Sequence, residues 1–364
     1  MPIYMDIHLV PGVKAHEVAK AHQHDLMLQD QYGCKCMTYW VDEGRESIFC
    51  LIDAPTKEAV EELHGKAHGM IPNKIIEVNT DLVSSFLGRI YDPENIPLTD
   101  DGLKVFADPS FRVLLLVKMP DPALLEHDSG NEKAQRLMGS YNEIIRSSLV
   151  KHSGTEVEYE GNCFIISFLS ASRALSCAQE IQREIGSNAG AGIRMSINGG
   201  EPIARSNKLF GDTLQLAAYM CSIAGDMQVV MASAVKELLA KEQLQLRGND
   251  LLALTPQEEN LLHALFIQLE ENWQQAEFDI DDYCRAMAMS KSQLYRKTIQ
   301  LTGLSPNILL REFRLEKAKE LMRRKSYSIS QITFDSGFSS PSYFTKCFKK
   351  KFGLLPMTYL DLLH

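Results

Sequence analysis

The last third of the chain contains two similar units, and no other feature restricts the fold as strongly. The first unit is FDIDDYCRAMAMSKSQLYRKTIQLTG and the second is YSISQITFDSGFSSPSYFTKCFKKKFG. Each is predicted to form a short helix, a turn and a second helix that begins with small polar residues, with Ser290 as the N-cap in the first unit. In the second unit Gly337 ends the first helix. This pattern is typical of proteins that read base edges in DNA.

The charge distribution supports this interpretation. Residues 285–351 contain 15 Lys and Arg against four acids, a local charge of +11, whereas the rest of the chain carries −20 within a total of −9. An acidic body with one basic block favours contact between that block and a polyanion. The alternative is a helical bundle with a solvated basic surface, which would not need a polar start on the second helix of each unit.

The stretch between the units, SPNILLREFRLEKAKELMRRK, is predicted to be a single connecting helix. Such a helix could hold two readers about one duplex turn, roughly 34 Å, apart. Its apolar residues recur at nearly helical spacing and are Leu310, Phe313, Leu315, Ala318, Leu321 and Met322.

Residues 258–364 resemble the tandem helix-turn-helix domain of AraC/XylS-type transcription regulators, over MSKSQLYRKTIQLTGLSPNILLREFRLEKAKELM and SISQITFDSGFSSPSYFTKCFKKKFGLLPMTYL. One departure is Leu360, where the family usually has arginine. The resemblance implies double-stranded DNA as a partner and a buried Phe344. It implies that the residues facing DNA are Lys291, Ser292, Gln293, Tyr295 and Arg296 in the first unit, and Ser340, Ser342, Tyr343, Thr345 and Lys346 in the second.

Residues 1–85 are predicted to form a ferredoxin-like α+β domain. The patterns from IYMDIHLV to KIIEVN follow the order strand, helix, strand, strand, helix, strand. Thr56 is expected to be the N-cap of the second helix.

Six of the ten histidines lie in the first 68 residues of the chain. His64 and His68 are four residues apart, so on a helix both imidazoles project from one face and can share a metal ion. Gly65 stands where a His-Glu-x-x-His protease needs its glutamate, which excludes that activity. Asp6 and His8 point to the same side of the first strand. A solvated surface pair of histidines is the alternative to a metal site.

The segment also resembles a small ferredoxin-like family described as nickel-binding, over MPIYMDIHLVPGV, AHQHDL, YGCKCMTYW and HGKAHGMIPNKIIEV. Nitrogen ligands with a thiolate suit Ni, Zn or Cu, and the sequence does not choose among these transition metals. The expected ligands are His8, His22, His64 and His68, with Asp6, Cys34 and Cys50 in reserve.

Residues 86–110 are rich in Pro, Asp and Gly and are predicted to be a linker. Residues 111–252 resemble the class III adenylate/guanylate cyclase domain, over FRVLLLVKM, EYEGNCFIISF and LFGDTLQLAAYMCSIAGDMQVV. The resemblance implies two metal-binding aspartates, yet Lys118 and Asn162 occupy those places. It also implies an Asn and an Arg where the chain has Gln215 and Tyr219. A lysine in place of a metal-binding carboxylate reverses the local charge, so cyclase activity is not expected.

The predicted fold class is therefore multidomain, with two α+β domains, ferredoxin-like and cyclase-like, followed by an all-α tandem helix-turn-helix domain at residues 256–364. The predicted function is a cytoplasmic, dimeric transcription regulator controlled by a metal ion or a small-molecule effector. No apolar run reaches 18 residues, so no membrane span is expected, and the scattered cysteines are expected to be reduced thiols. The alternatives are a nucleotide cyclase with a DNA-binding tail and a metal-buffering protein.

Overall fold

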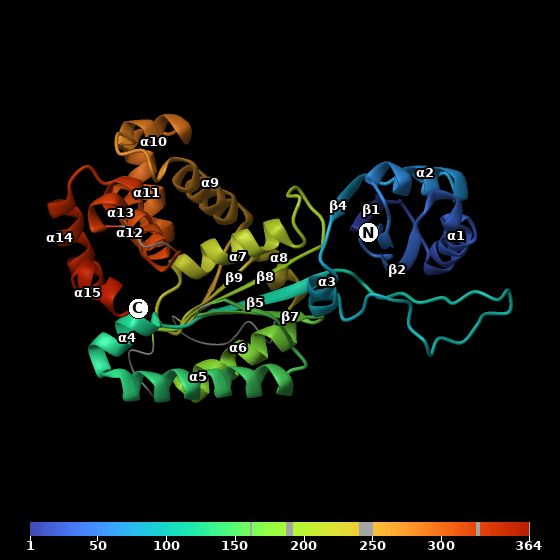
Figure 1. Ribbon diagram of the computed structural model, residues 1–364, viewed down its shortest axis with the longest axis horizontal. Helices are drawn as coiled ribbons and strands as arrows, with labels where there is room; N and C mark the ends of the chain where they lie inside the picture. Colours follow the sequence, from blue (N-terminus) through green and yellow to red (C-terminus); the bar gives the residue numbers. More distant parts are fainter. Residues whose placement is uncertain (161, 187–191, 240–249, 325–327, 364) are drawn as a thin grey trace.

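The computed structural model describes residues 1–160, 162–186, 192–239, 250–324 and 328–363. Three bodies follow one another along the long axis of the molecule (Figure 1). The N-terminal body and the middle body each contain one sheet with helices, and the C-terminal body is helical. This arrangement confirms the predicted fold class.

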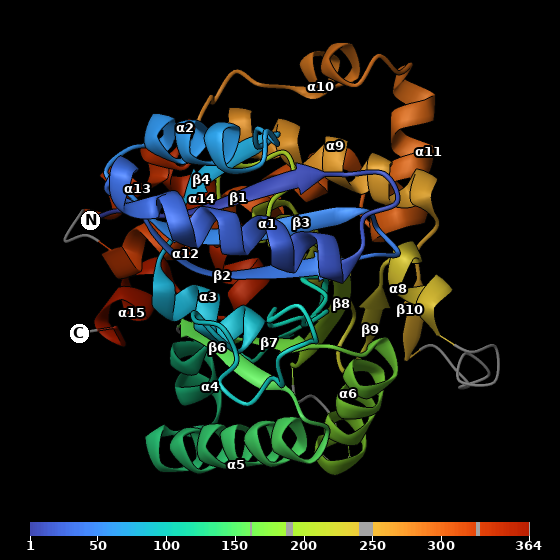
Figure 2. The ribbon, with the colours of Figure 1, turned by 90° about the vertical axis from the view of Figure 1, so that its right-hand side faces the viewer.

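The N-terminal body has a four-stranded sheet in the order β2-β3-β1-β4, and its pairings are antiparallel. The predicted ferredoxin-like order of strands and helices is confirmed. Thr56 caps α2 by accepting a hydrogen bond from the Ala59 amide at 3.2 Å. The helix α1 lies across the outer face of the sheet (Figure 2). The elements are β1 (Ile3–Leu9), α1 (Ala15–Leu28), β2 (Lys35–Asp42), β3 (Ser47–Asp53), α2 (Lys57–Ala67) and β4 (Lys74–Glu77).

The other face of this sheet packs on the middle body. Met5 and Ile7 of β1 belong to one buried cluster with Leu114, Leu116 and Phe210 of the middle body. The helix α3 (Thr80–Leu87), which was not predicted, contributes to the same cluster. Because both faces are covered, β1 is buried along most of its length.

The segment predicted to be a linker is attached to the N-terminal body. Leu103 and Phe106 are buried beside β2, and the ring of Phe106 stacks on that of Tyr39 with centroids 4.2 Å apart. The Val41 amide donates a hydrogen bond to the Asp108 carbonyl at 3.1 Å. The segment therefore forms a strap along the edge of the sheet.

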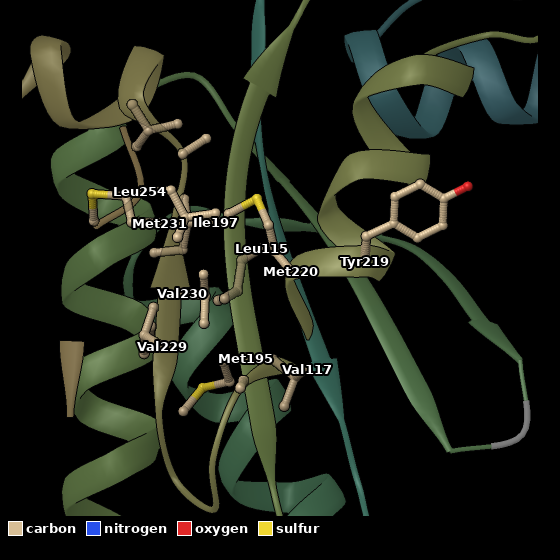
Figure 3. Close-up of a cluster of buried hydrophobic side chains, with 14 of the residues drawn as sticks. Leu115, Val117, Met195, Ile197, Tyr219, Met220, Val229, Val230, Met231 and Leu254 are labelled. Carbon is tan, nitrogen blue, oxygen red and sulfur yellow. The ribbon is translucent and has the colours of Figure 1, made fainter. Parts of the chain in front are cut away.

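The middle body is built on a six-stranded sheet in the order β10-β9-β8-β5-β7-β6. The strand β5, near the middle of this sheet, is buried on both faces. Leu115 and Val117 pack in the core with α5 and α6, and Leu114 on the opposite face packs against α7 and the N-terminal body. Figure 3 shows Leu115 and Val117 among the aliphatic side chains of the neighbouring strands, and Tyr219 projecting from α7 away from them. The elements are β5 (Arg112–Lys118), α4 (Pro122–Ser129), α5 (Asn131–Lys151), β6 (Thr155–Glu160), β7 (Cys163–Phe168), α6 (Ala171–Ile185), β8 (Arg194–Gly200), α7 (Gly211–Ile223), β9 (Val229–Met231), α8 (Ser233–Leu238) and β10 (Leu251–Ala253).

The C-terminal body is helical throughout the part that the structure describes, as predicted. Thr255 and Glu258 form a capping box at the start of α9, in which the Glu258 carboxylate accepts from the Thr255 amide at 2.8 Å. The helices are α9 (Pro256–Asn272), α10 (Ile280–Ala286), α11 (Lys291–Thr302), α12 (Pro306–Arg324), α13 (Ile329–Asp335), α14 (Pro341–Phe352) and α15 (Pro356–Asp361).

All eight cysteines are free thiols, in agreement with the expectation from their spacing. Among the described residues, no helix combines the length and the apolar character needed to cross a bilayer.

Candidate nucleic-acid interface and metal cluster

The first reading unit consists of α10 and α11, and its start is fixed by local hydrogen bonds. The Ser290 side chain accepts from the Gln293 amide at 3.3 Å, and the Gln293 side chain accepts from the Ser290 amide at 3.0 Å. This capping box confirms Ser290 as the N-cap of α11. It also assigns the Gln293 side chain a structural role at the position where a DNA contact was predicted.

The outer face of α11 is polar and exposed. Lys291, Ser292 and Arg296 are exposed, although Lys291 also pairs with Asp281 at 3.2 Å. Tyr295 is half-buried, and its hydroxyl accepts a hydrogen bond from the Asn307 amide group at 2.9 Å. The exposed side chains on the first two turns of α11 are therefore polar or basic and include Lys291, Ser292, Gln293 and Arg296.

The second reading unit, α13 and α14, repeats this plan. Ser340 caps α14 by accepting from the Tyr343 amide at 3.4 Å. Its side chain is thus used in capping, in addition to any role at DNA. Phe344 is fully buried, as expected. The remaining predicted contacts are exposed or half-buried and are Ser342, Tyr343, Thr345 and Lys346.

The helix α12 belongs to both units. Leu309 and Leu310, near its start, pack in the core of the first unit, whereas Leu315, Ala318 and Met322 pack in that of the second. The predicted connector is therefore confirmed. Because a continuous helix passes through both hydrophobic cores, it fixes the two recognition helices relative to each other.

The metal-ligand candidates gather between the sheet and the helices of the N-terminal body. The alternation of β1 places Asp6 and His8 on the side covered by α1 and α2, where they are 0% and 3% exposed. His64 on α2 reaches the same space and is 1% exposed. Cys50 comes from β3, directly opposite Asp6 in the strand pairing.

His64 is the centre of this group, which is called the histidine cluster below and comprises Asp6, His8, Asp25, Cys50, His64 and His68. Its Nε2 lies 3.1 Å from Asp6 Oδ2, and its Nδ1 lies 3.1 Å from Asp25 Oδ1 and 3.0 Å from His68 Nε2. The ligand atoms form two overlapping sets, each with all atoms within 4.8 Å of one another. One set is Asp6, His8, Cys50 and His64, and the other is Asp25, His64 and His68.

The electrostatics of the cluster are those of buried carboxylates around a cation. Burial lowers the pKa of His64, but the charge of Asp6 and hydrogen bonds to Asp25 and Asp6 outweigh it and raise the pKa to about 10. Burial raises the pKa of Asp6, but His64 and His8 outweigh it and hold the pKa well below its usual value. Burial and nearby carboxylates raise the pKa of the Cys50 thiol. Without a metal ion, His64 is therefore a charged imidazolium at neutral pH.

A buried ring nitrogen indicates that the cluster fits a metal ion. His8 Nε2 pairs with Asp6 Oδ1 at 3.1 Å, but the other ring nitrogen, His8 Nδ1, has no hydrogen-bond partner. Buried polar atoms are rarely left unpaired. A cavity of about 10 Å³, lined in part by His8, Asp25, Cys50 and His68, has the size of one ion or one water molecule. Nitrogen, oxygen and sulfur donors around such a cavity suit a transition metal.

The structure brings together most of the predicted ligands. His22 and Cys34 do not join the cluster: His22 pairs with Asp92 at 3.1 Å and lies beside Tyr39, although it lines the same cavity, and the Cys34 thiol donates to the Tyr32 carbonyl at 3.6 Å. Asp25 belongs to the cluster but was not predicted as a ligand. Asp25 lies one turn after His22 on α1, and this spacing could have indicated it as a further ligand.

Three of the four residues that the cyclase resemblance singled out, Asn162, Gln215 and Tyr219, contact other parts of the protein. The Asn162 side chain donates to the Met119 carbonyl at 2.6 Å. Gln215 donates to the Tyr219 hydroxyl at 2.8 Å and to the carboxylate of Glu270 on α9 at 3.4 Å. The Tyr219 ring stacks on Phe266 of α9, with centroids 4.7 Å apart. Gln215 and Tyr219 thus both contact α9, the first helix of the C-terminal body.

A second contact joins the same two bodies. Asp121, the N-cap of α4, is buried, and its Oδ2 accepts from Lys319 Nζ at 3.0 Å, Arg323 Nη2 at 2.6 Å and the Tyr359 hydroxyl at 2.9 Å. Its other oxygen caps α4 by accepting from the Ala123 amide at 3.2 Å. Burial raises the pKa of Asp121, but Lys319 and Arg323 outweigh it and lower the pKa.

Two segments of the chain, one near each end, match models of known families. Residues 283–361 match a helix-turn-helix domain, and residues 4–78 match the nickel responsive proteins similar to SCO4226. Both matches agree with the resemblances that the sequence indicated at the two ends of the chain.

Individual proteins similar to each body are also known. The transcriptional activator RhaS of Escherichia fergusonii is 32% identical over 124 residues, which are 34% of this chain and 44% of RhaS. The structure of SCO4226 from Streptomyces coelicolor is 31% identical, covering 21% of this chain and 94% of that one, with a TM-score of 0.20. An adenylate cyclase from Trypanosoma brucei is 18% identical, covering 37% of this chain and 78% of that one, with a TM-score of 0.32. The chain spans about half or less of the length of the curated relatives it matches.

Proposed function

We propose that this protein is a transcription regulator that binds double-stranded DNA through α11 and α14 and acts in the cytoplasm. The observation that carries the proposal is the pair of N-capped helices with exposed polar and basic starts, joined by one helix that passes through both cores. The starts of such helices reach base edges, and cations further along neutralise phosphates. The description of RhaS as a transcriptional activator supports the same function.

The predicted DNA-facing residues have different roles in this proposal. Exposed Ser292 and Ser342 lie at the helix starts and read bases, while Arg296 and Lys346 contact phosphates. The others, Lys291, Gln293, Tyr295, Ser340, Tyr343 and Thr345, combine a DNA contact with capping, ion pairing or packing in the free protein.

The effector in this proposal is a transition metal ion bound by the histidine cluster. Its ligands are the imidazoles of His8 and His64, the carboxylate of Asp6 and the thiolate of Cys50, which form one of the two sets. Asp25 and His68 contact the other ring nitrogen of His64 and orient it. The nickel responsive family match favours nickel over zinc or copper. Binding requires the loss of the His64 proton and the Cys50 proton. The ion favours the DNA-binding arrangement because it binds that arrangement more tightly.

The cyclase-like body is a scaffold in this proposal and not an enzyme. Its residues Lys118, Asn162, Gln215 and Tyr219 do not supply the two metal-binding carboxylates that two-metal phosphoryl chemistry needs. The contacts of Gln215 and Tyr219 with α9 support a role in holding the reader. The proposed domain limits are 1–85, 86–110, 111–252 and 256–364, and the proposed assembly is a homodimer.

Salt titration of DNA binding tests the central part of the proposal. A duplex selected from a random pool by the full-length protein is expected to lose affinity steeply with salt, because released counterions supply most of the binding free energy. Arg296→Ala and Lys346→Ala are each expected to weaken binding and to reduce the slope of log K against log salt by about 1. Lys133→Ala, at an exposed residue of α5, is the control and is expected to leave both the affinity and the salt slope unchanged. Salt-insensitive binding, or no binding, would contradict the proposal.

A further inference from the structure

A loop of the middle body is tied to the sheet of the N-terminal body by one lysine. Lys74 on β4 donates hydrogen bonds from Nζ to the carbonyl oxygens of Ala204, Arg205 and Ser206, at 3.0, 2.7 and 2.6 Å. Hydrogen bonds from a charged donor are roughly twice as strong as neutral ones. Three of them on consecutive residues fix this part of the loop to β4.

A second residue ties the start of the same loop. The Ser47 hydroxyl donates to the carboxylate of Glu201 at 2.6 Å, and Ser47 is fully buried. In the strand pairing, Ser47 lies opposite Leu9 and Lys74 lies opposite Ile7. The two attachment points of the loop therefore face the two residues of β1 that flank His8 of the histidine cluster.

The loop continues directly into α7. The Ser206 amide donates to the carboxylate of Asp212 in the first turn of α7, at 2.8 Å, and the Phe210 amide donates to the Pro202 carbonyl at 2.7 Å. At the other end of α7, Tyr219 stacks on Phe266 of α9. A continuous series of contacts thus connects β1 to the helix that opens the C-terminal body.

We propose that Lys74 and Ser47 are coupling residues, which transmit the occupancy of the histidine cluster through residues 201–210 and α7 to the DNA reader. The inference rests on the proposed function, since it requires metal binding by the cluster and DNA binding by the reader. A ligand ion that draws Asp6 and His8 together shifts β1, and both loop attachments follow because they pair with the neighbours of His8. Packed interiors transmit such shifts because they deform little.

Hydrogen exchange of the full-length protein, followed by mass spectrometry with and without Ni²⁺, tests the coupling without DNA. Ni²⁺ is expected to change the exchange of residues 201–223 in the wild-type protein. Lys74→Met is expected to bind the same amount of Ni²⁺ and to lose this change, and Ser47→Ala, which removes only a hydroxyl, is expected to reduce it. Lys20→Met, on an exposed site of α1, is the matched control and responds as the wild type does.

DNA binding provides the second readout. In the wild-type protein, Ni²⁺ is expected to tighten binding to the selected duplex by about fivefold or more, a usual size for coupling between two sites. In Lys74→Met the ratio of the DNA affinity with Ni²⁺ to that without Ni²⁺ is expected to fall to about one. Its affinity without Ni²⁺ is expected to stay at the wild-type value. A loss of folding would instead lower the DNA affinity both with and without Ni²⁺.

The outcomes separate the two claims. If the wild-type protein binds neither Ni²⁺ nor DNA, the proposed function fails and the coupling fails with it. If the wild-type protein binds Ni²⁺ and residues 201–223 do not respond, the coupling alone is wrong. A Lys74→Met or Ser47→Ala variant that responds to Ni²⁺ as fully as the wild type also overturns the coupling alone.

Discussion

His64 lies between two buried carboxylates, so a substitution there affects two ion pairs at once. Its imidazole bridges Asp6 and Asp25, each at 3.1 Å. Either carboxylate would be buried without its main partner if the imidazole were removed. Breaking a buried ion pair on one side usually costs about 3–5 kcal/mol, because it leaves an uncompensated charge.

The first prediction concerns His64→Ala. The variant is expected to bind Ni²⁺ below stoichiometry, because both ligand sets include His64. In metal-free buffer it is expected to lose about 3 kcal/mol or more of unfolding free energy. Metal analysis and denaturant unfolding measure the two effects. His16→Ala, at a 54% exposed side chain, is the control; equal Ni²⁺ content in the two variants would contradict the ligand assignment.

Part of this cluster could be predicted from the sequence and part could not. The pairs Asp6 with His8 and His64 with His68 follow from the periods of a strand and a helix, which are local properties. The choice of Asp25 over His22 depends on how α1 is rotated about its axis. That rotation is set by packing against β2 and α2, and the sequence of α1 does not determine it.

The turn between α13 and α14 shows how an element depends on one residue. Gly337 has φ of +76°, and a Cβ there would overlap the carbonyl oxygen of Trp273 and lie 2.8 Å from Arg314 Nε. The turn therefore lies directly against the C-terminal end of α9. Glycine is needed here for its left-handed backbone and for the close approach.

A pair of glycine variants separates these two requirements. Gly353→Ala, at φ of +83° with nothing within 4 Å of its Cβ, is expected to lose about 1 kcal/mol of unfolding free energy from the left-handed backbone alone. Gly337→Ala is expected to lose clearly more, because the steric overlap is added. Thermal unfolding of both variants measures the difference, and equal losses would mean that the contact with Trp273 is loose.

The elements were more predictable than their contacts. The starts of α2, α9, α11 and α14 follow from capping residues that lie within four positions of the helix. Two contacts are long-range, and no local sequence pattern predicts them. They are the attachment of the strap at Phe106 and the packing of α4 on the second unit through Ala123. The helix α3 was missed for a similar reason, since it is short and its burial comes from the middle body.

At the scale of the molecule, the middle body contacts the C-terminal body at several places. Tyr219 and Gln215 contact α9, while Asp121 contacts α12 and α15. The N-terminal body in turn rests on the middle body through the second face of its sheet. The three bodies are therefore in direct contact, as the proposed control of the reader by the histidine cluster requires.

The contact at Asp121 predicts a pH-dependent stability. Lys319 and Arg323 hold the pKa of Asp121 below the usual value of an aspartate. Its contribution to stability is therefore complete above that usual value and is lost as the pH falls through the folded pKa. Asp121→Asn retains an N-cap side chain but removes the charge. It is expected to destabilise the protein by about 3 kcal/mol at pH 7 and by less at pH 2.5, which lies below the usual pKa of an aspartate, about 3.9.

Denaturant unfolding at the two pH values measures this difference against the wild-type protein. Asp128→Asn, on the same helix with a 71% exposed side chain, is the charge-matched control and should change little at either pH. A deficit of Asp121→Asn that is the same at both pH values would show that the ion pairs with Lys319 and Arg323 do not carry the contact.

The most direct test of the account is the dissociation constant of the full-length protein for its selected duplex, measured at one salt concentration with and without stoichiometric Ni²⁺. The account predicts tighter binding with Ni²⁺, by about fivefold or more, and no effect of Ni²⁺ in His64→Ala. Equal dissociation constants with and without the ion, in a protein shown to contain it, would contradict the claim that the histidine cluster controls the DNA reader.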